Sequence, residues 1–203
     1  MSANAALPLD TLRTMANTND EVQDKRVQRT RQALLGAFFG LVLERRYDEI
    51  KVADILKRAG VGRSTFYEHF PNKDGILAGS LHGPFGILAD AMRETDNTAD
   101  LVRLLEHFRV NRAVARGIFL GAARRKTVAV LVGLIEQRFE FDGIGKTGVL
   151  LVPARLVAIQ LAEGLLGPVT AWLTGEVRCS AEALALALRR TAVATVAALR
   201  QPR

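Results

Sequence analysis

The sequence predicts an all-α protein in which a small head with a helix-turn-helix precedes a larger helical body. Two observations support this fold class. Residues 52–73 have the pattern of two short helices joined by a glycine turn, and the other periodic segments repeat apolar residues at helical spacing. The chain of 203 residues, 49% of them hydrophobic, is also long enough for a head and a body with a substantial core.

Three regions are expected along the chain. Residues 1–24 are small, polar and aperiodic, which predicts a disordered N-terminal arm. Residues 25–71 contain the helix-turn-helix domain, and its first helix is predicted over about 25–45. Residues 72–203 form the second, larger helical domain.

The glycine turn organises the head. Gly60 follows a short apolar helix and is the residue best able to end it at positive φ. The next helix is predicted over about 63–69, with Phe66 and Phe70 four residues apart on its buried side. In a helix-turn-helix this second helix lies in the major groove of DNA.

The exposed side of the second helix has the chemistry to bind DNA. The Arg63 guanidinium can pair with guanine O6 and N7, and the hydroxyls of Ser64 and Thr65 can bond to bases, so these three residues are the predicted base readers. Tyr67, His69 and Lys73 are predicted to bind phosphates, which sets the register without reading sequence. A basic face that is merely solvated is the alternative.

Positive charge is concentrated in the same region. The formal net charge of the chain is +7, and residues 25–73 contain 11 Lys and Arg against 5 Asp and Glu. Residues 1–24 contain one basic residue against four acidic ones. The charge density is therefore highest where attraction to phosphates would require it.

In the second domain, caps and helix breakers predict where the first helices begin and end. Asn72 can cap a helix that is expected to break at Gly83-Pro84, because proline is poorly tolerated inside a helix. Thr98 is expected to cap the next helix, whose apolar residues repeat at helical spacing.

The C-terminal part of the chain predicts further helices. Two shorter helical segments fit residues 115–141, and two longer helices fit 149–174 and 181–200. Gly175 separates the last two helices, and Ser180 is expected to cap the final one.

The segment from about Arg31 to Leu77 resembles the DNA-binding head of the tetracycline-repressor (TetR) family. The matching motifs are Arg31 with Leu34-Leu35, Tyr47, Val52-Ala-Asp-Ile55, Arg58-Ala-Gly-Val61, Arg63-Ser-Thr-Phe-Tyr67, His69-Phe70 and Lys73. This resemblance implies an all-helical fold: a three-helix helix-turn-helix head, a fourth helix as connector, and a C-terminal bundle that binds ligand and dimerises.

The resemblance also adds two residues to the predicted phosphate set, Arg31 and Lys51. Lys51 stands where the family usually has a serine or threonine that caps the second helix. A lysine can neutralise a phosphate but cannot cap a helix in the same way. Gly62 likewise replaces the usual serine before the recognition helix, although glycine is a tolerable cap.

The final two helices are predicted to form a dimer interface, because small residues interspersed with leucines let helices approach closely. The residues expected there are Leu161, Gly164, Leu165, Pro168, Ala185, Leu188, Ala192 and Thr195. An ordinary intrachain core explains the same pattern. The interface is preferred because a helix-turn-helix generally reads a palindrome as a dimer.

A ligand pocket is expected between residues 80 and 175. Its candidate lining residues are Phe85, Met92, His107, Phe108, Phe119 and Trp172, and for each of them a plain core position is the alternative. The basic run 124–126 could attract an anionic effector, although such a run is usually a solvated face.

Several function classes lack support in the sequence. A single Cys179 excludes a disulfide framework, the three histidines lack metal-ligand spacing, and no catalytic constellation is present, so we expect neither a metal, nor a cofactor, nor an enzyme. No signal peptide is evident. The apolar stretch 148–173 is interrupted by charged residues and by two prolines, Pro153 and Pro168, so a cytoplasmic protein without a membrane span is expected.

These observations predict a homodimeric transcriptional repressor that a small molecule of unknown identity releases from a palindromic double-stranded DNA operator. A protein that coats nucleic acid without regard to sequence is one alternative, supported by the positive charge. A ligand-independent adaptor on the same fold is another.

Overall fold

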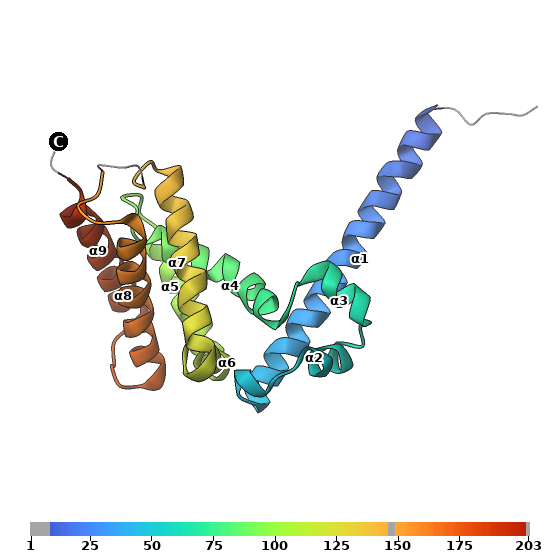
Figure 1. Ribbon diagram of the computed structural model, residues 1–203, viewed down its shortest axis with the longest axis horizontal. Helices are drawn as coiled ribbons and strands as arrows, with labels where there is room; N and C mark the ends of the chain where they lie inside the picture. The colour runs from blue at the N-terminus through green and yellow to red at the C-terminus, as the bar shows by residue number, and fades with distance from the viewer. Residues whose placement is uncertain (1–8, 146–148, 202–203) are drawn as a thin grey trace, which may run out of the picture.

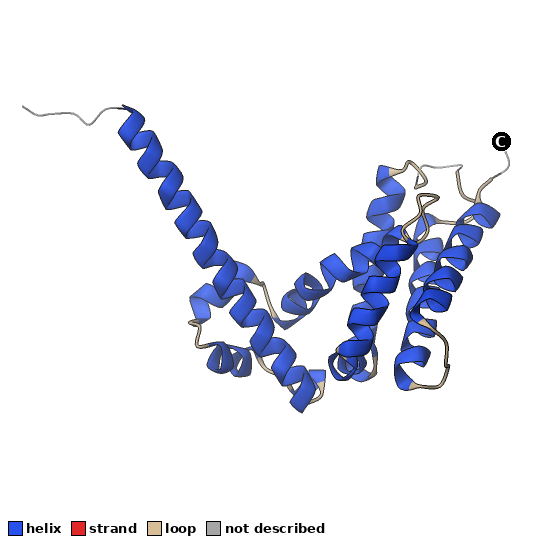
Figure 2. Cartoon of the chain, turned by 180° about the vertical axis from the view of Figure 1, so that it is seen from behind, coloured by secondary structure: helices blue, strands red, loops and turns tan. Residues whose placement is uncertain are grey.

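The computed structural model describes residues 9–145 and 149–201, with side chains from residue 25 onward, and these residues are helical with no β-strand. The elements are α1 (Leu9–Glu44), η1 (Tyr47–Glu49), α2 (Val52–Ala59), α3 (Arg63–His69), α4 (Lys73–Asp90), α5 (Thr98–Val110), α6 (Arg112–Phe119), η2 (Gly121–Ala123), α7 (Arg124–Phe141), α8 (Ala154–Thr174) and α9 (Ala181–Leu199). Figure 1 shows the head, built from α1, α2 and α3, joined through α4 to a bundle that ends with α9. The all-helical fold is confirmed, and Figure 2 shows the same arrangement from behind.

The head is held together by one group of buried apolar side chains. Leu34, Phe38 and Leu41 of α1 meet Ile55 of α2 and Phe66 of α3, and all five are at most 3% exposed. Burial of one such side chain contributes about 1.5–3 kcal/mol relative to leaving it exposed. This core therefore holds the three helices in one relative orientation.

The first helix is longer than the sequence predicted. Because α1 begins at Leu9, residues 9–24 are helical where a disordered arm was expected, and residues 1–8 lie outside the described part of the chain. No proline or glycine stands between Leu9 and Gly36. The part of α1 that packs in the head core can therefore continue upstream as a helix, because no helix-breaking residue ends it. Polar composition alone was a poor guide here.

The connector helix is continuous where a break was predicted. α4 contains Pro84 in its interior, at a typical cost of about 3 kcal/mol for the lost hydrogen bond and the ring clash. Leu81, Phe85 and Leu88 are buried on both sides of the proline, and α4 packs along α7. This tertiary packing offsets the local cost.

The body is a bundle in which α7 lies between α4 and α8, and α9 packs on α8 and α5 (Figure 1). Ala158 and Ala162 of α8 are completely buried, as is Ala185 of α9. Because these side chains are so small, α8 and α9 can pack closely within one chain.

Three helix ends match their predicted caps. The Asn72 side chain accepts a hydrogen bond from the backbone N–H of Gly75 at 2.8 Å, and Ser180 accepts one from Ala183 at 3.2 Å. Gly175 follows α8 with φ of 83°, the left-handed conformation that favours glycine. Short-range chemistry is therefore enough to predict these ends.

The helix predicted over residues 149–174 is observed as α8, which begins later, at Ala154, and ends at Thr174. α8 runs straight through Pro168, and among the described helices it is the one long and apolar enough, by length and composition, to cross a membrane. Val157, Leu161 and Leu165 are nonetheless buried, and the helix packs on both α7 and α9. Packing in the protein core accounts for its apolar composition.

The body touches the head where α6 crosses the end of α1. A Cβ atom added to Gly117 would lie 2.7 Å from Cγ1 of Val42 and 3.2 Å from the Val42 carbonyl oxygen. Contacts this short are not found between real Cβ atoms and their neighbours, so the crossing requires glycine at this position.

We expect Gly117→Ala to lower the free energy of unfolding by about 1–3 kcal/mol, because it overpacks this crossing. Urea denaturation measures the change. Gly133→Ala in α7 is the matched control, since a Cβ there meets nothing within 4 Å and replaces a poor helix former. It should be neutral or stabilise the fold, and equal losses from both variants would contradict the close contact.

Candidate nucleic-acid interface

The turn between α2 and α3 has the geometry that the sequence predicted. Gly60 adopts φ of 64°, and the backbone N–H of Val61 donates to the Leu56 carbonyl at 3.2 Å. On the inner side of α3, Phe66 and Phe70 are at most 2% exposed, with ring centroids 6.0 Å apart. These contacts fix which side of α3 faces outward.

The outward side of α3 brings the predicted DNA-binding residues together. Arg63, Ser64 and Tyr67 are exposed, whereas Thr65 and His69 are partly buried at the edges of the same face. The Arg63 guanidinium lies 5.9 Å from the centre of the Tyr67 ring. This face offers a planar cation, hydroxyl groups and a phenol on one short rigid helix.

Lys51 stands at the start of α2 and is exposed. The start of α2 is stabilised by Asp54, whose carboxylate accepts a hydrogen bond from the Lys51 backbone N–H at 2.9 Å. The Lys51 side chain is therefore not needed as a cap.

Two other predicted phosphate residues brace the head. The Lys73 ammonium donates to the Tyr47 carbonyl oxygen at 2.6 Å and lies 4.3 Å from the centre of the Tyr47 ring. Burial lowers the pKa of Lys73, although Asp74 beside it opposes this effect. Arg31 similarly lies 4.8 Å from the centre of the Phe70 ring. Both cations are tied to aromatic residues of the head.

Asp74, in the first turn of α4, connects the head to the body. Its carboxylate accepts hydrogen bonds from the Tyr47 hydroxyl in the head and from the Lys126 ammonium at the start of α7. Sequence analysis missed this link and interpreted the run containing Lys126 as a solvated face or an anion site. The partners stand 52 positions apart in the chain, so no local pattern could have revealed it.

The titration behaviour of these groups follows from the same geometry. Burial alone would raise the pKa of Asp74, but hydrogen bonds from Lys126 and Tyr47 outweigh it and hold this pKa below its ordinary value. Burial, together with the Asp74 carboxylate, raises the pKa of the Tyr47 hydroxyl above its usual range. Asp74 is therefore ionised and Tyr47 is neutral at physiological pH.

Comparison with known proteins agrees with this geometry. The family model for bacterial regulatory proteins of the tetR family matches residues 39–79, from the end of α1 to the start of α4. The HTH-type transcriptional regulator YxbF of Bacillus subtilis (strain 168) is 42% identical over 55 residues, which are 27% of this chain and only 14% of YxbF. A TetR transcriptional regulator from Streptococcus agalactiae 2603V has the same overall fold, with a TM-score of 0.53, 25% identity and coverage of 85% of this chain and 98% of that one.

The head of this chain is therefore similar to the DNA-binding head of the TetR family, and the chain has the fold of a TetR regulator. The family consists of transcriptional regulators that bind DNA, and none of the relatives described above is an enzyme.

Three of the six residues predicted to line a ligand pocket are packed on one another. Phe119 lies between Phe85 and Phe108, with ring centroids 5.9 and 5.2 Å apart, and all three rings are buried. His107 is exposed on α5. Trp172 donates its indole N–H to the Cys179 carbonyl at 2.9 Å. The burial of the three phenylalanines agrees with the alternative interpretation, in which they are core residues.

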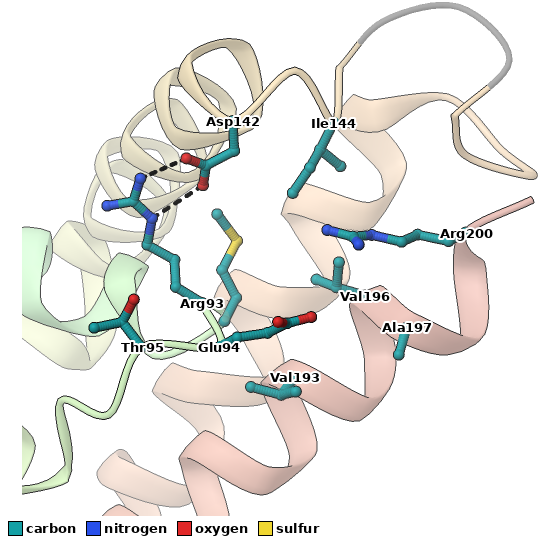
Figure 3. Close-up of a pocket in the computed structure, with 10 residues that line it drawn as sticks. Arg93, Glu94, Thr95, Asp142, Ile144, Val193, Val196, Ala197 and Arg200 are labelled. Carbon is teal, nitrogen blue, oxygen red and sulfur yellow. Dashed lines mark hydrogen bonds and ion pairs between the residues drawn. The ribbon is translucent and has the colours of Figure 1, made fainter.

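Met92, the sixth predicted pocket residue, lines a recess of about 530 Å³ between the segment after α4, the segment after α7 and the end of α9 (Figure 3). The floor is apolar and includes Ile144 and Val196. At the rim, Arg93 forms an ion pair with Asp142, and the Arg200 side chain extends over the opening. The recess combines apolar surface with charge and is large enough for a small organic molecule.

The predicted dimer interface needs a correction. Leu161, Leu165, Ala185, Leu188 and Ala192 are at most 3% exposed within a single chain, because α8 and α9 pack their small and leucine side chains against each other. The interface prediction was wrong for these five, which form intrachain core. The predicted residues that keep surface exposure are Gly164, Pro168 and Thr195.

We expect Asp74→Asn to lower the free energy of unfolding at neutral pH by about 1 kcal/mol, since a half-exposed charged link is weaker than a buried one. Because folding depresses the pKa of Asp74, its contribution is present above the unfolded-state value of about 3.9 and is lost as the pH falls through the folded-state value. The difference in unfolding free energy between wild type and variant should therefore shrink as the pH falls below about 3.9.

Urea denaturation between pH 3 and pH 7 measures this difference. Asp48→Asn is the control, because Asp48 forms only an exposed ion pair with Arg46 at 3.2 Å and should contribute nothing measurable. A loss for Asp74→Asn that did not change with pH would exclude the charged link.

Proposed function

We propose that this protein is a homodimeric, cytoplasmic repressor of the TetR family that binds a palindromic operator and is released from it by a small molecule. The observation that supports operator binding best is the outward face of α3. Phe66 and Phe70 hold the helix from within, while Arg63, Ser64 and Tyr67 are presented to solvent. A helix fixed in this way can enter a major groove without rearrangement.

The side chains of the head divide into two roles. Arg63 would read a guanine through its two parallel N–H groups, with Ser64 and Thr65 on neighbouring bases. Lys51 and Tyr67 are exposed and would bind phosphates on either side, with His69 partly buried at the edge. Arg31 lies over the Phe70 ring and Lys73 lies over the Tyr47 ring. Both cations therefore stabilise the head first, and they would bind phosphates from these positions.

The dimer would form through the outer faces of α8 and α9, which lie at the edge of the bundle in Figure 1. Leu156 and Ile159 of α8 are 47% and 40% exposed, and Leu186 of α9 is 40% exposed. Small residues accompany them on these faces, among them Gly164, Ala183, Ala187 and Ala194. Exposed apolar residues at this density on adjacent helices are typical of an interface between subunits.

Ligand release would act through the contacts between body and head. At Asp74, α7 contacts the first turn of α4. At Gly117, α6 contacts the end of α1. A ligand bound in the body, for example in the recess beside Met92, changes the spacing of the two heads only if it prefers the conformation that does not fit the operator.

The first test measures affinity for DNA from upstream of the protein's own gene and for random duplex, across a salt series. The wild type should prefer the specific site by at least about 10³ at physiological salt. Arg63→Ala should cost about 1–3 kcal/mol on the operator and relax one base position, whereas Lys51→Ala should weaken both duplexes alike.

Equal losses on operator and random DNA for Arg63→Ala would refute its base-reading role. Equal wild-type affinities for both duplexes would point instead to a protein that binds phosphates without reading sequence.

Ile159→Glu combined with Leu186→Glu should convert the dimer to a monomer, because two buried carboxylates per subunit would face an apolar interface. Sedimentation equilibrium measures the mass. Val110→Glu is the control, since Val110 is 81% exposed on α5 and is not part of the proposed interface. A double variant that stays dimeric would place the interface elsewhere.

A further inference from the structure

The turn between α8 and α9 forms one side of a second recess, which we call the α8–α9 recess. Its walls come from the end of α5, the start of α6, the end of α8 and the start of α9. Its volume is about 660 Å³, within the range of small-molecule sites. Figure 1 shows this turn at the end of the body opposite the C-terminus. The proposed function assigns no role to it.

Two side chains that line the α8–α9 recess are held in place by backbone carbonyls. The indole N–H of Trp172 donates to the Cys179 carbonyl at 2.9 Å, while part of the ring stays exposed. The guanidinium of Arg112 donates through Nε to the Leu173 carbonyl, and its Nη2 lies 3.3 Å from where a Cβ of Gly175 would be. The recess therefore presents an aromatic ring and a guanidinium that are already positioned.

The charged residues of the α8–α9 recess carry a surplus of one positive charge, since three arginines and two glutamates line it. Glu106 forms an ion pair with Arg109 at 2.6 Å. Glu182 accepts a hydrogen bond from its own backbone N–H at the start of α9, which lowers its pKa. Among the described side chains, no acid forms an ion pair with Arg112 or Arg178. Acidic residues whose side chains are not described lie on the first part of α1, which Figure 1 shows running away from the body.

These features favour one class of ligand. The planar forks of Arg112 and Arg178 match the two oxygens of a carboxylate, and a monoanion balances the single surplus charge, whereas a phosphate dianion exceeds it. The exposed part of the Trp172 indole offers a flat apolar surface, on which an aromatic ring stacks. A bare inorganic anion would leave this surface uncovered.

We infer that the α8–α9 recess binds a small aromatic carboxylate, whose ring lies against Trp172 and whose carboxylate binds Arg112 and Arg178. A ligand in this position contacts the start of α6 and the turn after α8 at the same time, so it strengthens the connection between them. The inference does not rest on DNA binding, because none of these residues belongs to the head. The site is also distinct from the recess that Met92 lines, which shares no residue with it.

Fluorescence offers a direct test, because Trp172 is the single tryptophan of the chain and its emission reports on this recess. Titration of the full-length protein with benzoate at neutral pH should change the emission and saturate, with a Kd on the order of 1 mM for a molecule of this size. Benzamide lacks the charge and acetate lacks the ring, so each should bind at least about tenfold more weakly. Free N-acetyltryptophanamide corrects for collisional quenching.

Arg178→Gln removes one guanidinium at an exposed position and should weaken benzoate binding about tenfold. Arg116→Gln is the matched control, since Arg116 is also an exposed arginine that pairs with no described acid, but it does not line this recess. The control should bind benzoate as the wild type does. Circular dichroism and the urea midpoint should match wild type for both variants, because both side chains are exposed.

Several results would overturn the inference. One is a benzoate response that does not saturate, and another is equal affinity for benzoate and benzamide. Equal losses in Arg178→Gln and Arg116→Gln would show that only the overall charge matters. Emission that depends on protein concentration but not on benzoate would mean that a second copy of the chain covers the recess. None of these results concerns binding to duplex DNA, so failure here is distinguishable from failure of the proposed function.

Discussion

The structure depends on the continuity of α4, because this one helix belongs to both the head and the body. Ile76 and Leu77 in its first part are completely buried in the core, and Asp74 bonds to Tyr47 and Lys126 at the same level. The second half of α4 packs along α7 on the far side of Pro84. A break at the proline would divide the helix that joins the head to the body, so the packing that keeps α4 intact also preserves this connection.

The head illustrates how a few buried residues determine the chemistry of an exposed surface. Phe66 and Phe70 occupy one side of α3, and Gly60 sets the angle at which the helix leaves the turn. Once these are placed, Arg63 and Tyr67 point outward, because they leave α3 on the side away from the buried rings. The buried apolar side of α3 thus determines which polar side chains face outward. DNA would bind to a surface whose helix is already held in place.

The body divides its apolar residues between two tasks. In α8 and α9 the inner residues, such as Leu165 and Ala185, hold the bundle together, while Ile159 and Leu186 stay at the surface. The inner and the outer residues are both apolar, and they differ only in the direction in which the side chain leaves its helix. For this reason five of the eight residues first predicted for the interface are core residues, and the surface proposed for the dimer lies on the outer sides of the same helices.

The sequence by itself determined the all-helical class, the glycine turn, the buried pair Phe66 and Phe70, and the caps at Asn72 and Ser180. Each of these depends on residues within a few positions of one another, where propensity and hydrogen bonding act locally. Only the tertiary structure decided that α4 passes through Pro84, that α1 extends to Leu9, and that Lys126 reaches Asp74. Those outcomes depend on packing and charge between segments far apart in the chain, and their energies are large enough to override a local preference.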